Sequence, residues 1–130
     1  MARAYTVATA ALALQVSNKW IDNTLSHFVV QGVSQARQGV PRKLSVESLS
    51  VLAITLALIQ NFGAQLSIAI DVATQLIGSN GRIELASGVV LEIDIEKTNA
   101  TLLERLEHAV EIAPLPRRGR PPQKTTGRLD

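Results

Sequence analysis

Apolar residues recur every three to four positions along much of the chain, the spacing that places side chains on one face of an α-helix. The first such run, Thr6–Gln15, is rich in alanine and leucine and has no helix breaker, so it predicts a short helix. After a brief interruption, Ser17 is a good N-cap for a second helix over Asn18–Phe28. The pattern therefore predicts helix, tight turn and helix within about two dozen residues.

Two longer helices are expected after an irregular stretch. Gln31–Leu44 contains two glycines and a proline without a helical period, which indicates a loop or small hairpin. Ser45 then has the character of an N-cap for a helix that continues to Phe62 and ends at Gly63. The amphipathic run Ala64–Ile77 predicts a further helix.

The periodicity changes to alternation over Arg82–Glu96, which predicts a β-hairpin with a turn at Ser87-Gly88. On this interpretation the carboxylates of Glu92, Asp94 and Glu96 form a ladder on the wet face of the second strand. A last helix is expected to start near Thr101, where Thr101 and Glu104 would make a capping box. Its apolar stripe would comprise Leu102, Leu103, Leu106, Ala109 and Val110.

Charge is distributed unevenly along the 130 residues, although the net charge is only +2. Residues 1–43 carry five basic and one acidic side chain, residues 44–113 three and nine, and residues 114–130 five and one. A polyanion responds to the local field of a basic patch rather than to the total charge, so nucleic acid is a candidate partner. The longest apolar stretch, Val51–Ile59, is less than half of what a bilayer needs, so no membrane association is expected.

Residues 5–77 resemble the DNA-binding domain of MerR-type regulators. That family starts with Tyr-Thr and a helix ending in Leu-Gly-Val-Ser, followed by a recognition helix, a wing with Gly-x-Arg and a helix opened by Ser-x-Glu-x-Leu. The corresponding segments here are Tyr5-Thr6, Leu14–Ser17, Asn18–Leu25, Gly39–Arg42 and Ser45–Leu49. The resemblance implies a winged helix-turn-helix that binds double-stranded DNA.

Departures from the family pattern limit what is carried over. Gln15 stands where the family has its turn glycine, so it must accept a backbone geometry that glycine normally supplies. Pro41 adds one residue to the wing, and the hairpin of residues 82–96 replaces the family's long dimerisation helix and effector domain. No metal or drug effector is therefore expected.

The segment after Pro114 is rich in proline and arginine and has no apolar period, so we expect it to be extended and disordered when free. Within it, Arg118-Gly119-Arg120-Pro121 resembles an AT-hook, a motif that lies in the narrow minor groove of A·T-rich DNA. Glycine permits close approach to the groove floor, and arginines enter its negative potential. The alternative is a plain basic tail that contacts phosphates or only adds solubility.

The candidate DNA-binding residues follow from these elements. The N-terminal residues of a recognition helix reach base edges in the major groove, and a wing projects cations toward phosphates. The candidates are Ser17, Asn18, Lys19, Trp20, Asn23, Arg37, Arg42 and Lys43, with Arg117, Arg118, Gly119 and Arg120 in the tail. Asp22 lies on the same polar side of the helix. For Trp20, packing in the core is the preferred interpretation over contact with DNA.

The expected architecture is α+β and mainly helical, in three regions. Residues 1–78 form the winged helix-turn-helix, residues 79–113 an interaction or dimerisation element, and residues 114–130 a disordered basic tail. The chain has no cysteine, lone histidines at His27 and His108, and no nucleophile or phosphate-loop motif. We therefore expect no enzyme, cofactor or metal site.

Two functional hypotheses remain. The first is a small dimeric transcriptional regulator in the cytoplasm, associated with the nucleoid, because one recognition helix contacts too few base pairs for useful specificity. The alternative is an antitoxin or adaptor that holds a basic protein partner through the acidic hairpin and the last helix. Duplex binding by the purified protein alone favours the first, and binding only with a co-purifying partner favours the second.

Overall fold

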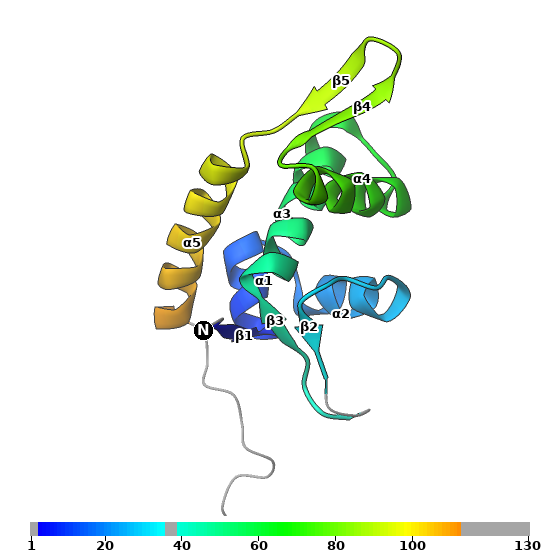
Figure 1. Ribbon diagram of the computed structural model, residues 1–130. Coiled ribbons are helices and arrows are strands. Elements are labelled where there is room, and N and C mark those ends of the chain that lie inside the picture. The colour runs from blue at the N-terminus through cyan, green and yellow to red at the C-terminus, as the bar shows by residue number, and fades with distance from the viewer. Residues whose placement is uncertain (1–2, 36–38, 113–130) are drawn as a thin grey trace, which may run out of the picture.

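Helices make up most of the part of the chain that the computed structural model describes, residues 3–35 and 39–112 (Figure 1). They are α1 (Val7–Leu14), α2 (Asn18–His27), α3 (Val46–Phe62), α4 (Leu66–Gly78) and α5 (Ile95–Ile112). A first antiparallel sheet contains β1 (Ala4–Thr6), β2 (Val33–Ser34) and β3 (Lys43–Ser45), and a second contains β4 (Arg82–Ala86) and β5 (Val89–Glu92). The predicted α+β, mainly helical class is confirmed.

Hydroxyl side chains cap the first three helices by accepting hydrogen bonds from backbone amides that have no partner within the helix. Ser17 Oγ accepts from the Trp20 amide at 3.0 Å, and Ser45 Oγ accepts from the Ser48 amide at 3.2 Å. Thr6 caps α1 in the same way. The predicted N-caps Ser17 and Ser45 are confirmed, and so is the end of α3 at Gly63.

The first sheet is small because each strand has only two or three residues. Its middle strand is β3, which pairs with β1 on one side and β2 on the other. Leu44 lies opposite both Tyr5 and Val33 and is completely buried, so it joins the sheet to the core. The hairpin expected within residues 31–44 therefore forms, with β2 and β3 as its strands.

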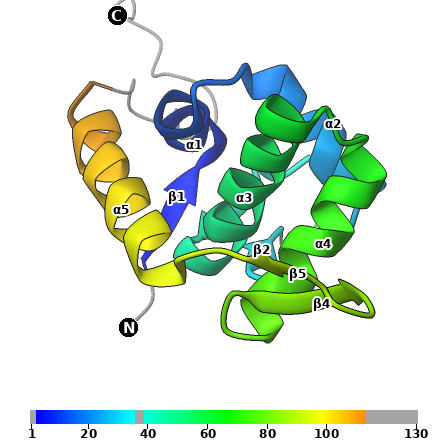
Figure 2. The ribbon, with the colours of Figure 1, turned by 90° about the horizontal axis from the view of Figure 1, so that it is seen from above.

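Helix α3 lies between the other elements and packs on two apolar clusters (Figure 2). The first cluster contains α1, the sheet, the N-terminal half of α3, and α5; Leu52 and Leu106 are completely buried in it. The second contains the C-terminal half of α3, α4 and the root of the β4–β5 hairpin, with Leu76 completely buried. The region expected at residues 79–113 thus contributes to both clusters. The hairpin and Ile95 at the start of α5 pack against the second cluster, and Leu102, Leu106 and Ala109 of α5 belong to the first.

The prediction for the end of the second hairpin strand was wrong. Strand β5 ends at Glu92, and α5 begins at Ile95, six residues before Thr101. Asp94 starts a helix instead of continuing the strand: its Oδ1 accepts a hydrogen bond from the Lys97 amide at 3.0 Å, as the side chain of an N-cap residue does. The carboxylate ladder over Glu92, Asp94 and Glu96 therefore does not form.

The predicted capping box at Thr101 and Glu104 was also wrong, because both residues lie inside α5. The stripe of the last helix is confirmed in part: Leu102, Leu106 and Ala109 are buried, whereas the side chains of Leu103 and Val110 remain 42% and 39% exposed. The buried positions recur every three to four residues, so the periodicity was read correctly and only the start of the helix was misplaced.

Within residues 3–35 and 39–112, no helix is both long enough and apolar enough to cross a bilayer.

Candidate nucleic-acid interface

Helix α2 presents an uninterrupted polar stripe to solvent. Its exposed residues are Asn18, Lys19, Asp22, Asn23, Ser26 and His27, two on each successive turn. Ile21 and Thr24 on the opposite side are buried, and Leu25 and Phe28 are partly buried. An amphipathic helix packs its apolar side against the core, and its polar side then remains available for a ligand. The sequence-predicted residues Asn18, Lys19 and Asn23 all lie on this stripe, and Ser17 caps the helix beside them.

The turn before α2 has the left-handed backbone that its sequence made doubtful. Gln15 has φ of 61° and ψ of 45°, the conformation usually taken by glycine after a helix. The amides of Gln15 and Val16 donate to the carbonyls of Leu12 and Ala11, so the last turn of α1 is closed normally. The replacement of glycine is therefore accommodated, with strain in the backbone of one residue.

Trp20 faces the body of the protein. It is partly buried and packs against the first apolar cluster, next to Ile21 in the sequence. This confirms core packing as the role of the indole and removes Trp20 from the residues that extend freely from α2.

The hairpin of β2 and β3 lies against α2. Lys43 is exposed on the middle strand, whereas the neighbouring Leu44 points into the core. Gln35 Nε2 donates to the Val40 carbonyl at 2.7 Å and links the two sides of the hairpin below its tip. Arg37, the remaining basic residue predicted for the wing, lies outside the described residues.

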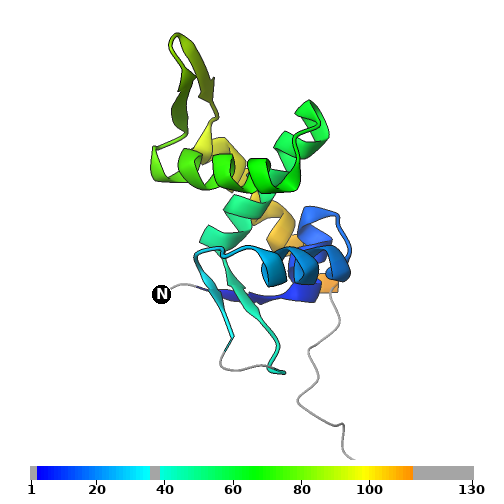
Figure 3. The same cartoon turned by 90° about the vertical axis from the view of Figure 1, so that its right-hand side faces the viewer.

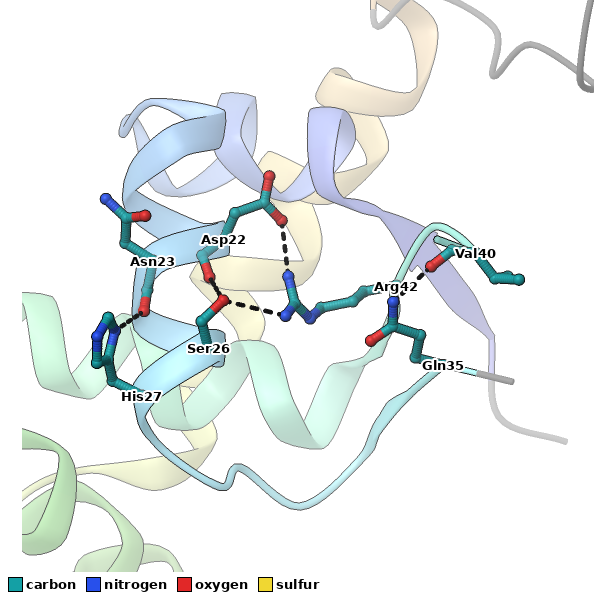
Figure 4. A network of polar contacts seen from close by, with 7 residues as sticks. All are labelled: Asp22, Asn23, Ser26, His27, Gln35, Val40 and Arg42. Atoms are coloured by element: carbon teal, nitrogen blue, oxygen red, sulfur yellow. Dashed lines mark hydrogen bonds and ion pairs between the residues drawn. The ribbon is translucent and has the colours of Figure 1, made fainter. Parts of the chain in front are cut away.

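Arg42 contacts α2 rather than extending from the hairpin (Figure 4). Its Nη1 donates to Asp22 Oδ1 at 3.1 Å and its Nη2 donates to Ser26 Oγ at 3.2 Å. The Ser26 hydroxyl in turn donates to the Asp22 carbonyl at 2.7 Å. The Arg42 side chain is only 22% exposed, and that of Asp22 is 52% exposed. Sequence reasoning grouped Arg42 with the free cations and did not foresee that Asp22, twenty positions earlier, would hold it.

A further cation near the sheet was missed by the sequence reasoning. Arg3 precedes β1, and its guanidinium lies 5.2 Å from the centre of the Tyr5 ring, a cation–π geometry that orients the side chain. In the antiparallel pairing of β1 and β3, Thr6 lies opposite Lys43 and Ala4 lies opposite Ser45, so Arg3 is at the end of β3 away from Lys43. The sequence contains a signal for this contact, because residues two apart in an extended segment lie on the same face, and Arg3 is two residues before Tyr5.

The chemistry available at this surface is that of charge and hydrogen bonding. His27 has its Nδ1 2.8 Å from the Asn23 carbonyl, within α2 itself. Among residues 3–35 and 39–112, His, Asp and Glu side chains form no group of three or more that could hold a metal ion. Lys19 and Lys43 supply positive charge, and the amide of Asn23 can both donate and accept.

The tail residues predicted to bind DNA, Arg117, Arg118, Gly119 and Arg120, lie outside the described residues. Compared with protein-family models, with curated proteins and with solved structures, the chain has no significant match. The resemblance of residues 5–77 to MerR-type domains therefore stays a prediction.

Proposed function

We propose that the protein binds double-stranded DNA sequence-specifically, with α1 and α2 as a helix-turn-helix and the β2–β3 hairpin as its wing. The observation that carries this proposal is the exposed polar stripe on α2, a capped helix that follows a tight turn and lies beside a hairpin with basic residues. A helix of this kind fits the width of the major groove.

The side chains divide into two roles on this proposal. Lys19 and Asn23 lie in the first turns of α2, where a docked helix reaches base edges; lysine can contact guanine and asparagine can contact adenine. Lys43 lies on β3 and would contact a phosphate, which orients the protein without reading sequence.

We propose that the active form is a homodimer joined through the β4–β5 hairpin. The hairpin projects away from the helices (Figures 1 and 3), and neither strand pairs with a third strand within the described residues. Ile83 and Leu91 are partly buried at its root, but Leu85 and Val89 near its tip are 54% and 52% exposed. Open edges with apolar side chains favour pairing with an identical hairpin, and two-fold symmetry doubles the DNA site.

The adaptor hypothesis loses part of its basis in this fold. It depended on an acidic hairpin together with the last helix, whereas Asp94 caps α5, Glu96 lies in the first turn of α5, and Arg82 lies opposite Glu92 in the hairpin. For this reason DNA binding is the function that we propose.

The tail is proposed to add affinity by an electrostatic route. Deleting residues 114–130 removes five of the 13 lysine and arginine side chains, so duplex affinity should fall and its salt dependence should flatten. An AT-hook would make this loss largest on probes with A·T-rich flanks, and a uniform loss would identify a plain basic anchor. Unchanged affinity and salt slope would exclude the tail from DNA binding.

The double variant Lys19→Ala/Asn23→Ala tests whether α2 is the reader, that is, the helix whose side chains contact the base edges. Binding would be measured to a duplex that the full chain has selected from a random library and to random-sequence duplex, over a range of salt concentrations. The affinity ratio between the two should fall roughly tenfold or more, because each base contact supplies on the order of 1–3 kcal/mol of discrimination. Random-sequence affinity should change much less.

A matched control is Asn61→Ala/Lys97→Ala, which removes the same residue types from exposed positions on α3 and α5. It should leave the affinity ratio unchanged. Equal losses on both duplexes in the α2 variant, or no loss at all, would show that α2 is not the reader.

A further inference from the structure

The ion pair between Arg42 and Asp22 joins two elements that the proposed function uses separately, the wing and the reading helix. Arg42 directly precedes β3, and Asp22 and Ser26 lie one turn apart on α2. The planar guanidinium supplies two donors in a fixed fork, which matches two acceptors at this separation. Figure 4 shows both donors directed at α2.

The Ser26 hydroxyl completes the arrangement because it uses both of its hydrogen-bonding capacities. It donates to the Asp22 carbonyl at 2.7 Å and accepts from Arg42 at 3.2 Å. On the hairpin side, Gln35 holds Val40, two residues before Arg42. The contact therefore ties a braced hairpin to a helix rather than joining two mobile side chains.

The charge of Asp22 makes the contact relevant to a polyanion. Asp22 is the one acidic side chain among residues 1–43, and it lies on the same stripe as Lys19 and Asn23. An unpaired carboxylate at that position would repel phosphate. Arg42 cancels this charge, and in doing so its own charge is withdrawn from the DNA backbone.

We propose that Arg42 and Asp22 form a latch that sets the position of the wing on α2 and thereby determines discrimination between DNA sequences. The inference rests on the proposed function. Arg42 acts here as a positioning residue, and Lys19 and Asn23 remain the readers. The latch lowers the affinity for random-sequence duplex, because it keeps the charge of Arg42 away from phosphates. It raises the ratio of the affinities for selected and random-sequence duplex, because it fixes the position of the wing relative to α2.

The test uses the full chain with the charge-neutral double variant Asp22→Asn/Arg42→Gln. It removes one negative and one positive charge, so the net charge is conserved and random-sequence affinity and salt slope should stay close to those of the natural chain. The affinity ratio between the selected duplex and random duplex should fall about fivefold or more, the ratio that one hydrogen bond of ordinary strength supports. The single variant Asp22→Asn should raise random-sequence affinity and steepen the salt slope by about one, since it frees Arg42 for a phosphate.

Amide hydrogen exchange provides a readout that does not depend on DNA. In the double variant the amides of the β2–β3 hairpin should exchange about fivefold faster, while those in the middle of α3 should not change. The control Arg105→Gln/Glu107→Gln removes the same charges from exposed positions on α5 and should alter neither exchange nor the affinity ratio.

The outcomes separate the two proposals. An unchanged affinity ratio in Asp22→Asn/Arg42→Gln overturns the latch. Unchanged hydrogen exchange in the β2–β3 hairpin also overturns it, because the pair would then not hold the hairpin on α2. If the natural chain binds no duplex in a salt-dependent way, the proposed function and the role of the latch in discrimination both fail. Faster hairpin exchange would then show that the contact is real and that the error lay in assigning DNA as the ligand.

Discussion

The two ends of α3 carry surfaces of opposite chemistry. Near its N-terminus lie α2 and the β2–β3 hairpin, where Lys19, Lys43 and one ion pair are at the surface and the large apolar side chains turn inward, except for the exposed Val29 between α2 and β2. Near its C-terminus lie α4 and the β4–β5 hairpin, where apolar side chains such as Phe62, Leu85 and Val89 are more than half exposed. Exposed polar groups on a rigid helix suit a wet, charged ligand, and exposed apolar groups beside open strand edges suit a second protein surface.

The difference also concerns how each hairpin is held. The β2–β3 hairpin is attached to the body by the buried Leu44, by pairing with β1 and by Arg42. The β4–β5 hairpin is held at its root, where the Gly81 amide donates to the Leu76 carbonyl of α4 at 2.7 Å and Ile83 and Leu91 pack against the second apolar cluster. A two-stranded ribbon without further support is marginal in water, so the second hairpin gains most from association.

The largest effect is expected from Gly32→Ala, which would disrupt the packing at the N-terminal end of α3, beside α2 and the β2–β3 hairpin. Gly32 has φ of +90°, and an added Cβ would overlap Ser45 Oγ, the atom that caps α3. Backbone strain and loss of the cap should together lower the free energy of unfolding by about 2–4 kcal/mol, measured by urea denaturation.

Gly39→Ala is the matched control, because Gly39 has φ of +88° and open space around its Cβ position. Gly39→Ala should lower the free energy of unfolding only through backbone strain, by about half of the loss expected for Gly32→Ala or less. Equal losses in the two variants would mean that the contact with Ser45 has no energetic importance.

The next effect concerns the opposite end. Leu85→Gln/Val89→Thr should weaken the proposed dimer by about 2 kcal/mol, roughly thirtyfold in its dissociation constant, because two half-exposed apolar side chains would no longer be buried between subunits. Light scattering over a concentration series measures this directly. Affinity for a selected duplex should fall in parallel, since the second half-site is lost.

Leu103→Gln changes a similarly exposed leucine on α5 and should leave the mass unchanged. A natural chain that is monomeric at tens of micromolar, on the order of the range in which weak dimers already associate, would contradict the dimer and leave the exposed hairpin without the partner proposed for it.

The smallest effect is expected from Gln15→Gly, which sharpens the view that the turn before α2 is strained. Because glycine adopts positive φ without steric cost, the variant should be more stable by about 0.5–1 kcal/mol, with discrimination between duplexes unchanged. Asn80→Gly offers a comparison at φ of +57°, where asparagine already tolerates the left-handed region, so its gain should be smaller. Destabilisation by Gln15→Gly would contradict the strain.

Local signals in the sequence determined much of this protein. The periodic runs placed α1 to α4 within one or two residues of their observed ends, and the caps at Ser17 and Ser45 followed from side chains that bond to amides three residues away. The stripe on α2 was also predictable, because period and polarity together define which face of a helix is wet.

Only the tertiary structure decided the remaining features. Asp94 could continue a strand or cap a helix, and the choice depended on how the chain turns at Gly81 and Ile93 and on the packing of Leu102 and Leu106 against α1 and α3. Likewise Arg42 has the sequence context of a free wing cation, and its partner Asp22 became visible only once the hairpin lay on α2. Period and capping depend on residues within a turn or two, whereas pairings across twenty or more positions depend on the fold that brings them together.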